Sequence, residues 1–367
     1  MSDPRLKKLA DILVNYSVKV KPGEWVHINS SVVAIPLLKE VYQKALEAGG
    51  NVTTSLYTDD LNEQFLNQAN NEQLEWISPI SRVVSEQVKV SIHLNGAENT
   101  RALSGVDPKK QSMRSKAQRS LTETFFTRSA SKDLRWVLTD YPCLAFAQEA
   151  DMSLSDFEDF VFAATYADTK DPVAEWTRIH NEQQKVVDWL AGKKTVRVQS
   201  PNADLTLSIE GRTFINSDGT HNMPSGEVFT GPVEDSANGW VKFTYPAIEK
   251  GREVEGVYLE FKDGKVVKAS AEKNEDFLLS QLDTDEGSRY LGEFAIGTNY
   301  GIQKFTKSIL FDEKIGGSFH MALGGGYPET GSLNKSSIHW DMICDIRHDS
   351  EIRVDGELLY KDGKFQI

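Results

Sequence analysis

The chain has 367 residues, of which 39% are hydrophobic and 26% charged, and its formal net charge is −13. This length favours two domains, and the negative charge disfavours a nucleic-acid-binding protein, which needs a basic face. Two cysteines, Cys143 and Cys344, are too few for a disulfide scaffold and favour a reducing compartment. The sequence contains no apolar run that could span a bilayer and no secretory signal pattern, so we expect a cytoplasmic protein.

The first half alternates helical and strand patterns. Helices are predicted over 4–17, 36–48, 73–87, 108–127, 153–166 and 172–190, and strands over 24–29, 51–57, 88–94 and 134–140. Helices that alternate with short apolar strands indicate βαβ units around an open parallel or mixed sheet. We therefore predict an α/β N-terminal domain over 1–192.

The pattern changes near residues 190–195, where short alternating strands begin to dominate. Asp-Gly pairs at 263–264, 355–356 and 362–363 predict hairpin turns between such strands. One helix is expected over 274–282. The second half is thus predicted to be a β-rich α+β domain, 193–367, which also carries the candidate metal ligands described next.

Polar residues that can bind metal gather between residues 293 and 341. His320 and His339 lie there with Glu293, Tyr327 and Asp341. Imidazoles mixed with carboxylates suit zinc, cobalt or manganese. Nearby glycine pairs and triplets allow tight turns, so that ligands from several short strands can converge.

Two carboxylates share an unusual local context. Glu227 and Glu293 each follow a glycine and precede an apolar run. A carboxylate on an apolar strand is costly to bury unless it is paired or bound to metal. His339 and Asp341 are two residues apart and point to one side of a strand. Three carboxylates and two imidazoles suffice for two divalent ions that share one carboxylate, which predicts a dinuclear metal hydrolase.

Several other residues have simpler interpretations. His27 and His93 lie inside apolar strands and are expected to be buried and hydrogen-bonded rather than functional. Cys344 is expected to pack in the core beside Met342. The basic run between Lys109 and Arg119 has helical spacing without aromatic residues and predicts a solvated helix face.

Four segments, with the opening LADILVNYSVKVKPGEWVHI, resemble the M29 family of metallo-aminopeptidases of the aminopeptidase T or S type. The segments are MPSGEVFTGPVEDSANG, RYLGEFAIGTNYGI, DEKIGGSFHMALGGGYP and IHWDMICDIR. They occur in the family's order, and the resemblance covers essentially the whole chain. It implies a two-domain subunit, a homodimer with a secluded cavity, and two divalent ions (Zn, Co, Mn or Mg) per subunit.

The resemblance also implies a reaction and a set of site residues. The reaction is removal of N-terminal residues from peptides by a water that two metal ions activate. The family's metal-binding positions match Glu227, Glu293, His320, Tyr327, His339 and Asp341. The chain is shorter than expected for the family, chiefly between Tyr327 and His339, which affects the expected substrate preference.

Some roles and functions stay open at the level of sequence. Glu227 or Glu293 could act as general base rather than ligand, and Tyr327 could be a weak ligand or an oxyanion donor. Glu234 and Asp235 are acidic candidates for holding the substrate amine, although a solvated loop is the simpler interpretation. The alternative functions are a different metal-dependent amidase, a phosphoesterase, or a non-catalytic small-ligand-binding α/β protein. Neither nucleic acid nor a membrane is an expected partner.

Overall fold

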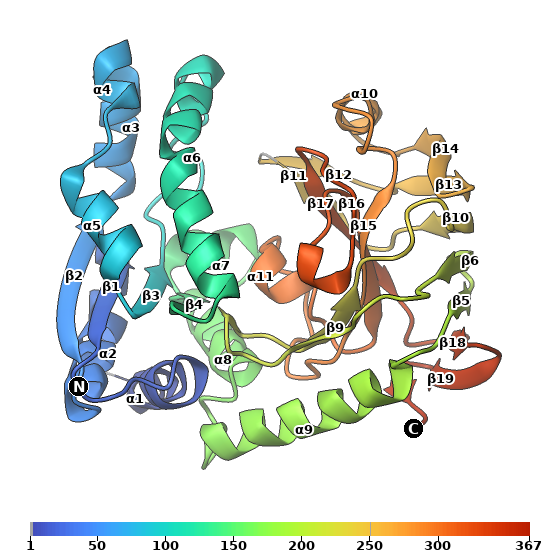
Figure 1. Cartoon of the computed structure of the whole chain (residues 1–367), viewed down its shortest axis with the longest axis horizontal. Coiled ribbons are helices and arrows are strands. Elements are labelled where there is room, and N and C mark those ends of the chain that lie inside the picture. The colour runs from blue at the N-terminus through green and yellow to red at the C-terminus, as the bar shows by residue number, and fades with distance from the viewer. Residues whose placement is uncertain (1–2, 250) are drawn as a thin grey trace. The chain divides into compact units, whose positions relative to one another are not determined.

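The structure is a computed structural model that describes residues 3–249 and 251–367. The chain divides into two compact units (Figure 1). Unit 1 comprises residues 1–176 and 219–224, and unit 2 comprises residues 177–218 and 225–367. The predicted domains, 1–192 and 193–367, differ from these units in extent and stay predictions. No helix in the described parts of the chain has the length and apolar content to cross a membrane.

Unit 1 is built on a parallel five-stranded sheet, as the alternating pattern predicts. The strand order is β2-β1-β3-β4-β8, and every neighbouring pair is parallel. The strands are β1 (Trp25–Ser31), β2 (Asn51–Tyr57), β3 (Val90–Asn95), β4 (Arg135–Asp140) and β8 (Asn222–Met223). Because β8 lies far along the chain, this edge of the sheet depends on a segment that the predicted N-terminal domain does not include.

The helices of unit 1 begin at capping and proline signals. Pro108 starts α6 behind the N-cap Asp107, and Ser153 caps α8. The predicted helix over 73–87 is instead two helices, since Pro79 starts a new one. The helices are α1 (Pro4–Asp11), η1 (Ile12–Ser17), η2 (Val32–Ala34), α2 (Ile35–Glu47), α3 (Asp59–Gln68), α4 (Asn71–Glu75), α5 (Pro79–Gln87), α6 (Pro108–Ala130), α7 (Leu144–Glu149) and α8 (Leu154–Ala164), followed by α9 (Pro172–Leu190), which enters unit 2.

Unit 2 contains two larger antiparallel sheets. One has eight strands in the order β14-β13-β10-β6-β5-β18-β19-β20, and the other has five in the order β17-β16-β15-β9-β7. The eight strands are β5 (Thr195–Ser200), β6 (Ala203–Ser208), β10 (Asn238–Lys242), β13 (Tyr258–Lys262), β14 (Lys265–Ser270), β18 (Glu351–Val354), β19 (Glu357–Lys361) and β20 (Lys364–Phe365). The five are β7 (Ile215–Ser217), β9 (Glu227–Thr230), β15 (Leu291–Gly297), β16 (Ser318–Gly324) and β17 (His339–Asp345).

Shorter elements complete unit 2. They are the β11 (Ala247–Glu249) and β12 (Arg252–Val254) pair, helices α10 (Glu275–Leu282) and α11 (Ile309–Asp312), and the 3-10 turn η3 (Pro328–Thr330). The three predicted Asp-Gly hairpin turns are confirmed. Both residues of each pair have positive φ, which matches the right-handed twist of the flanking strands.

The five-stranded sheet has two chemically different faces. Side chains alternate along a strand, so every second residue points to the same face. One face supplies Phe294, Phe319, Met321, Trp340 and Cys344 to the apolar core that is shared with the eight-stranded sheet. The core position of Cys344 is as predicted. The opposite face carries the candidate metal ligands.

Removal of a large core side chain should destabilise unit 2. Trp340 is buried in the apolar core, so we expect Trp340→Ala to lower the free energy of unfolding by about 3–5 kcal/mol. Urea denaturation followed by circular dichroism measures this change. Trp76→Ala, at an exposed tryptophan, is the matched control and should change stability by about 0.5 kcal/mol or less. Equal effects of the two changes would contradict the assignment of the core face.

Candidate metal centre

The five strongest sequence candidates converge on one face of the five-stranded sheet. Glu227 lies on β9, Glu293 on β15, His320 on β16, and His339 and Asp341 on β17. Each of them has glycine or alanine as a ladder partner on at least one neighbouring strand, which leaves space above the sheet for the longer polar side chains. The pairs are Glu227 with Gly297, Glu293 with Ala322, His320 with Ala295, His339 with Gly324, and Asp341 with Ala322.

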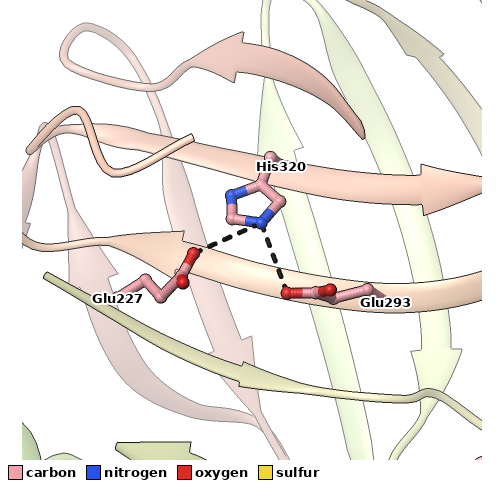
Figure 2. Close-up of side chains that lie close together, drawn as sticks. All are labelled: Glu227, Glu293 and His320. Carbon is pink, nitrogen blue, oxygen red and sulfur yellow. Dashed lines mark ion pairs between the residues drawn. The ribbon is translucent and has the colours of Figure 1, made fainter. Parts of the chain in front are cut away.

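His320 lies between two carboxylates (Figure 2). Its Nε2 atom is 3.5 Å from Oε2 of Glu227 and 3.4 Å from Oε1 of Glu293. These three residues form one group whose potential ligand atoms all lie within 4.8 Å of one another. All three side chains are buried. The group could hold a cation through one imidazole nitrogen and two carboxylate oxygens.

A second such group shares Glu293 with the first. Nε2 of His339 is 3.4 Å from the other Glu293 oxygen, Oε2, and 3.6 Å from Oδ2 of Asp341. The Nδ1 atom of His339 lies 2.6 Å from the carbonyl oxygen of Gly325. Donation of an Nδ1 proton to that carbonyl would leave Nε2 free to bind metal. Glu293 therefore presents one oxygen to each imidazole, as a bridging carboxylate does. Asp341 does so at longer range, since its Oδ1 lies 4.0 Å from Nε2 of His320.

The glycines before the two glutamates permit close approach of neighbouring backbone. A Cβ atom on Gly226 would lie 2.7 Å from Cβ of Asn299, and Gly226 has φ of +118°. A Cβ on Gly292 would lie 2.3 Å from the carbonyl oxygen of Gly325. The second contact brings the loop after β16 against β15, next to Glu293. Close packing of neighbouring segments thus explains why glycine precedes Glu227 and Glu293 in the sequence.

Several buried polar atoms of the centre have no hydrogen-bond partner among the described residues. They are Oε2 of Glu227, both ring nitrogens of His320 and Oδ1 of Asp341. Buried polar atoms are normally satisfied, and unsatisfied ones are costly. An ion between these atoms would satisfy most of them, so the residues present fit a divalent metal.

Burial and neighbouring charge shift the pKa of all five candidate ligands. Burial raises the pKa of Glu227 to about 7 and that of Asp341 to about 6. Burial opposes ionisation of Glu293 too, but contacts with both imidazoles lower its pKa to about 2. Burial would lower the pKa of the histidines, yet the carboxylates raise it to about 9 for His320 and about 10 for His339. These raised pKa values favour the protonated form of both imidazoles at neutral pH.

Tyr327 lies at the rim of the centre. Its ring centroid is 5.2 Å from that of His339 and 5.5 Å from that of Phe229. The residue remains 42% exposed, and burial of the phenol together with nearby carboxylates raises its pKa above the ordinary value. The phenol thus keeps its proton at neutral pH and can donate a hydrogen bond.

Sequence reasoning missed two residues beside the centre. Glu313 forms a third group with His320 and Asp341 whose potential ligand atoms lie within 4.8 Å of one another. Lys314 is fully buried, with Nζ 3.6 Å from Oε1 of Glu227 and in closer contact with Glu313. Burial would lower the pKa of Lys314, but the two carboxylates outweigh it and raise the pKa. The only sequence signal was three consecutive charged residues, Asp312, Glu313 and Lys314, inside the run 309–319, which is otherwise uncharged.

Glu234, a sequence candidate for the substrate amine, is engaged elsewhere. Its carboxylate pairs with Arg212 at 2.6 Å and accepts a hydrogen bond from the Leu333 amide at 2.7 Å. Arg212 also donates to the carbonyl oxygen of Gly331. These contacts hold the loop between β16 and β17, so Glu234 has a structural role. Asp235 is exposed.

Comparison with known proteins decides the family. Residues 2–365 match the family described as thermophilic metalloprotease (M29). The chain belongs to the M29 metalloprotease family. Aminopeptidase 2 of Geobacillus stearothermophilus is 29% identical over 404 residues, which span 99% of this chain and 95% of that protein. Membership in M29 implies use of a divalent metal, which agrees with the ligand groups found in the structure.

Solved structures support the fold of this M29 protein. AmpT from Thermus thermophilus matches with a TM-score of 0.86 at 23% identity, over 99% of both chains. A 2,5-dihydroxypyridine dioxygenase from Pseudomonas putida matches with a TM-score of 0.61 at 13% identity, over 98% of this chain and 96% of that one. Since proteins named for different chemistry share this fold, the fold alone does not decide the reaction.

Metal affinity should depend strongly on pH. Imidazole must lose its proton to bind metal, and the pKa values of His320 and His339 lie above neutral pH. We therefore expect metal affinity to rise from about pH 6 to about pH 9, with up to about two protons released per chain at pH 7. Isothermal titration calorimetry in buffers of different ionisation enthalpy measures the release. A metal affinity that is constant from about pH 6 to about pH 9 would contradict the conclusion that His320 and His339 are protonated before metal binds.

Proposed function

We propose that the protein is a metal-dependent aminopeptidase that removes N-terminal residues from peptides. The observation that carries the proposal is the position of Glu293, whose two oxygens face two different imidazoles. One ion would be held by Glu227, Glu293 and His320, and the other by Glu293, His339 and Asp341. Family membership and the aminopeptidase name of the Geobacillus relative support the reaction.

When bound, paired divalent ions polarise the scissile carbonyl and make a water nucleophilic at neutral pH. The chain's own residues would supply the remaining functions. Glu313 lies next to both groups and is the carboxylate that neither ligand trio needs, which makes it a better candidate for accepting the water proton than Glu227 or Glu293. The protonated phenol of Tyr327 would donate a hydrogen bond to the oxyanion that develops on the substrate.

The identity of the metal, the oligomeric state and the cellular location are also proposals. The mixed nitrogen and oxygen ligands suit zinc, cobalt or manganese, and magnesium is a further candidate. A homodimer is expected from the family resemblance and can be tested by light scattering after gel filtration. A cytoplasmic location is expected from the sequence alone.

A substrate panel tests the proposed reaction. Aminoacyl-p-nitroanilides and their N-acetylated counterparts would be incubated with EDTA-treated protein before and after addition of Co²⁺, Zn²⁺ or Mn²⁺. The proposal predicts metal-restored cleavage of the free-amine compounds only. Cleavage of the acetylated compounds would instead favour an amidase of another kind, and no turnover at all would favour a binding protein.

The bridging carboxylate should be indispensable. Glu293→Gln keeps the side-chain size but removes the charge that would hold both ions, so we expect kcat/KM to fall by about 1000-fold or more. Glu286→Gln, at an exposed glutamate, is the matched control and should keep full activity. Circular dichroism would show that both variants are folded. Substantial activity of Glu293→Gln would remove Glu293 from its assigned role.

A further inference from the structure

Lys314 places a fixed positive charge beside the centre. Its side chain is fully buried, which is rare for lysine unless the ammonium group is paired. The ammonium contacts Glu313 and lies 3.6 Å from Oε1 of Glu227. Among the described residues, no lysine or arginine forms an ion pair with Glu293 or Asp341. Of the proposed ligand carboxylates, the positive charge therefore lies closest to Glu227 and acts on Asp341 only at longer range.

The backbone around Lys314 fixes this position. Its amide donates to the carbonyl oxygen of Phe311 at 3.0 Å, and its own carbonyl accepts from the Asn299 amide at 3.0 Å. A Cβ atom on Gly297 would lie 2.2 Å from the carbonyl oxygen of Ile315. Gly297 is the ladder partner of Glu227. The absence of a side chain at Gly297 thus lets the Lys314 segment lie directly against the strand pair that carries Glu227.

The two oxygens of the Glu227 carboxylate have different neighbours. Oε1 faces Lys314, whereas Oε2 faces His320 and has no hydrogen-bond partner among the described residues. One oxygen is thus occupied by an internal cation and the other is left for a ligand. In the second group, Glu293 with His339 and Asp341, no carboxylate oxygen forms an ion pair with a lysine or arginine among the described residues.

We propose that Lys314 makes the two ion positions unequal in affinity. The ion at Glu293, His339 and Asp341 is held tightly, and the ion at Glu227, Glu293 and His320 is held weakly and exchanges. Two effects of Lys314 act in the same direction. Its charge repels a cation across a poorly screened interior, and its contact restricts Glu227 to a single free oxygen. This inference rests on the proposed two-ion centre and adds an order of binding to it.

Zinc titration of metal-free full-length protein tests the inference without measuring hydrolysis. Calorimetry and competition with a chelator should resolve two binding steps of unequal affinity in the wild-type chain. In Lys314→Met and Lys314→Gln the weaker step should tighten by about 10- to 100-fold, the range over which groups next to metal ligands change affinity. The tighter step should change much less.

Two variants separate charge from positioning. Lys314→Gln keeps a hydrogen-bond donor near Glu227 but removes the charge, whereas Lys314→Met removes both. If both variants raise the zinc affinity of the weaker step, the positive charge of Lys314 causes the difference in affinity between the two ion positions. If the weak step is unchanged or weaker in Lys314→Gln, the proposal is wrong, because Lys314 would then assist binding at that position. Lys335→Met, at an exposed lysine, removes the same charge in solvent and should leave both steps unchanged.

Further outcomes separate this inference from the proposed function. Two zinc-binding steps of equal affinity in the wild-type chain would contradict the proposed difference between the ion positions but would still support the two-ion centre. No zinc binding in the wild-type chain would overturn the centre itself and the inference with it. Each variant's fold would be checked by circular dichroism with zinc present, where the ion offsets the carboxylates that loss of Lys314 leaves unpaired.

Discussion

The site depends on the charge balance of a buried cluster of acidic side chains. Glu227, Glu293 and Asp341 converge above one sheet face with Glu313 beside them. Buried carboxylates are stable only when cations or hydrogen-bond donors offset them. In the protein alone, two protonated imidazoles and the Lys314 ammonium provide the positive charge. Divalent ions would replace the imidazole protons, so the same charge constraint that shapes the cluster also suits it to metal.

The two faces of the five-stranded sheet couple this site to the core. Phe294 and Trp340 point into the apolar core, while their neighbours Glu293, His339 and Asp341 point to the centre. A slip of one residue in any of these strands would bring a carboxylate or imidazole into the core and remove it from the site. Core packing therefore fixes the register that brings the candidate ligands from four strands together.

Much of this arrangement was predictable because its signals are local. The spacing of His339 and Asp341 indicated a shared strand face, and the two Gly-Glu contexts indicated carboxylates among apolar neighbours. The parallel sheet of unit 1 followed from alternating helices and strands, although α3 and the short α7 were missed. Strand β8 joins that sheet from a distant part of the sequence, which no local pattern indicates.

Glu313 and Lys314 could not be assigned for a related reason. They follow the short helix α11 and lie outside any strand pattern, so their approach to Glu227 and His320 arises only from tertiary packing. Glu234 shows the converse case, since its pairing with Arg212 removed a plausible acidic candidate from the site.

The most direct test of the central claim is anomalous diffraction from crystals grown with Zn²⁺ or Mn²⁺. The account predicts two peaks, one on each side of Glu293, each near a different imidazole; a single peak, or peaks away from Glu293, would contradict it.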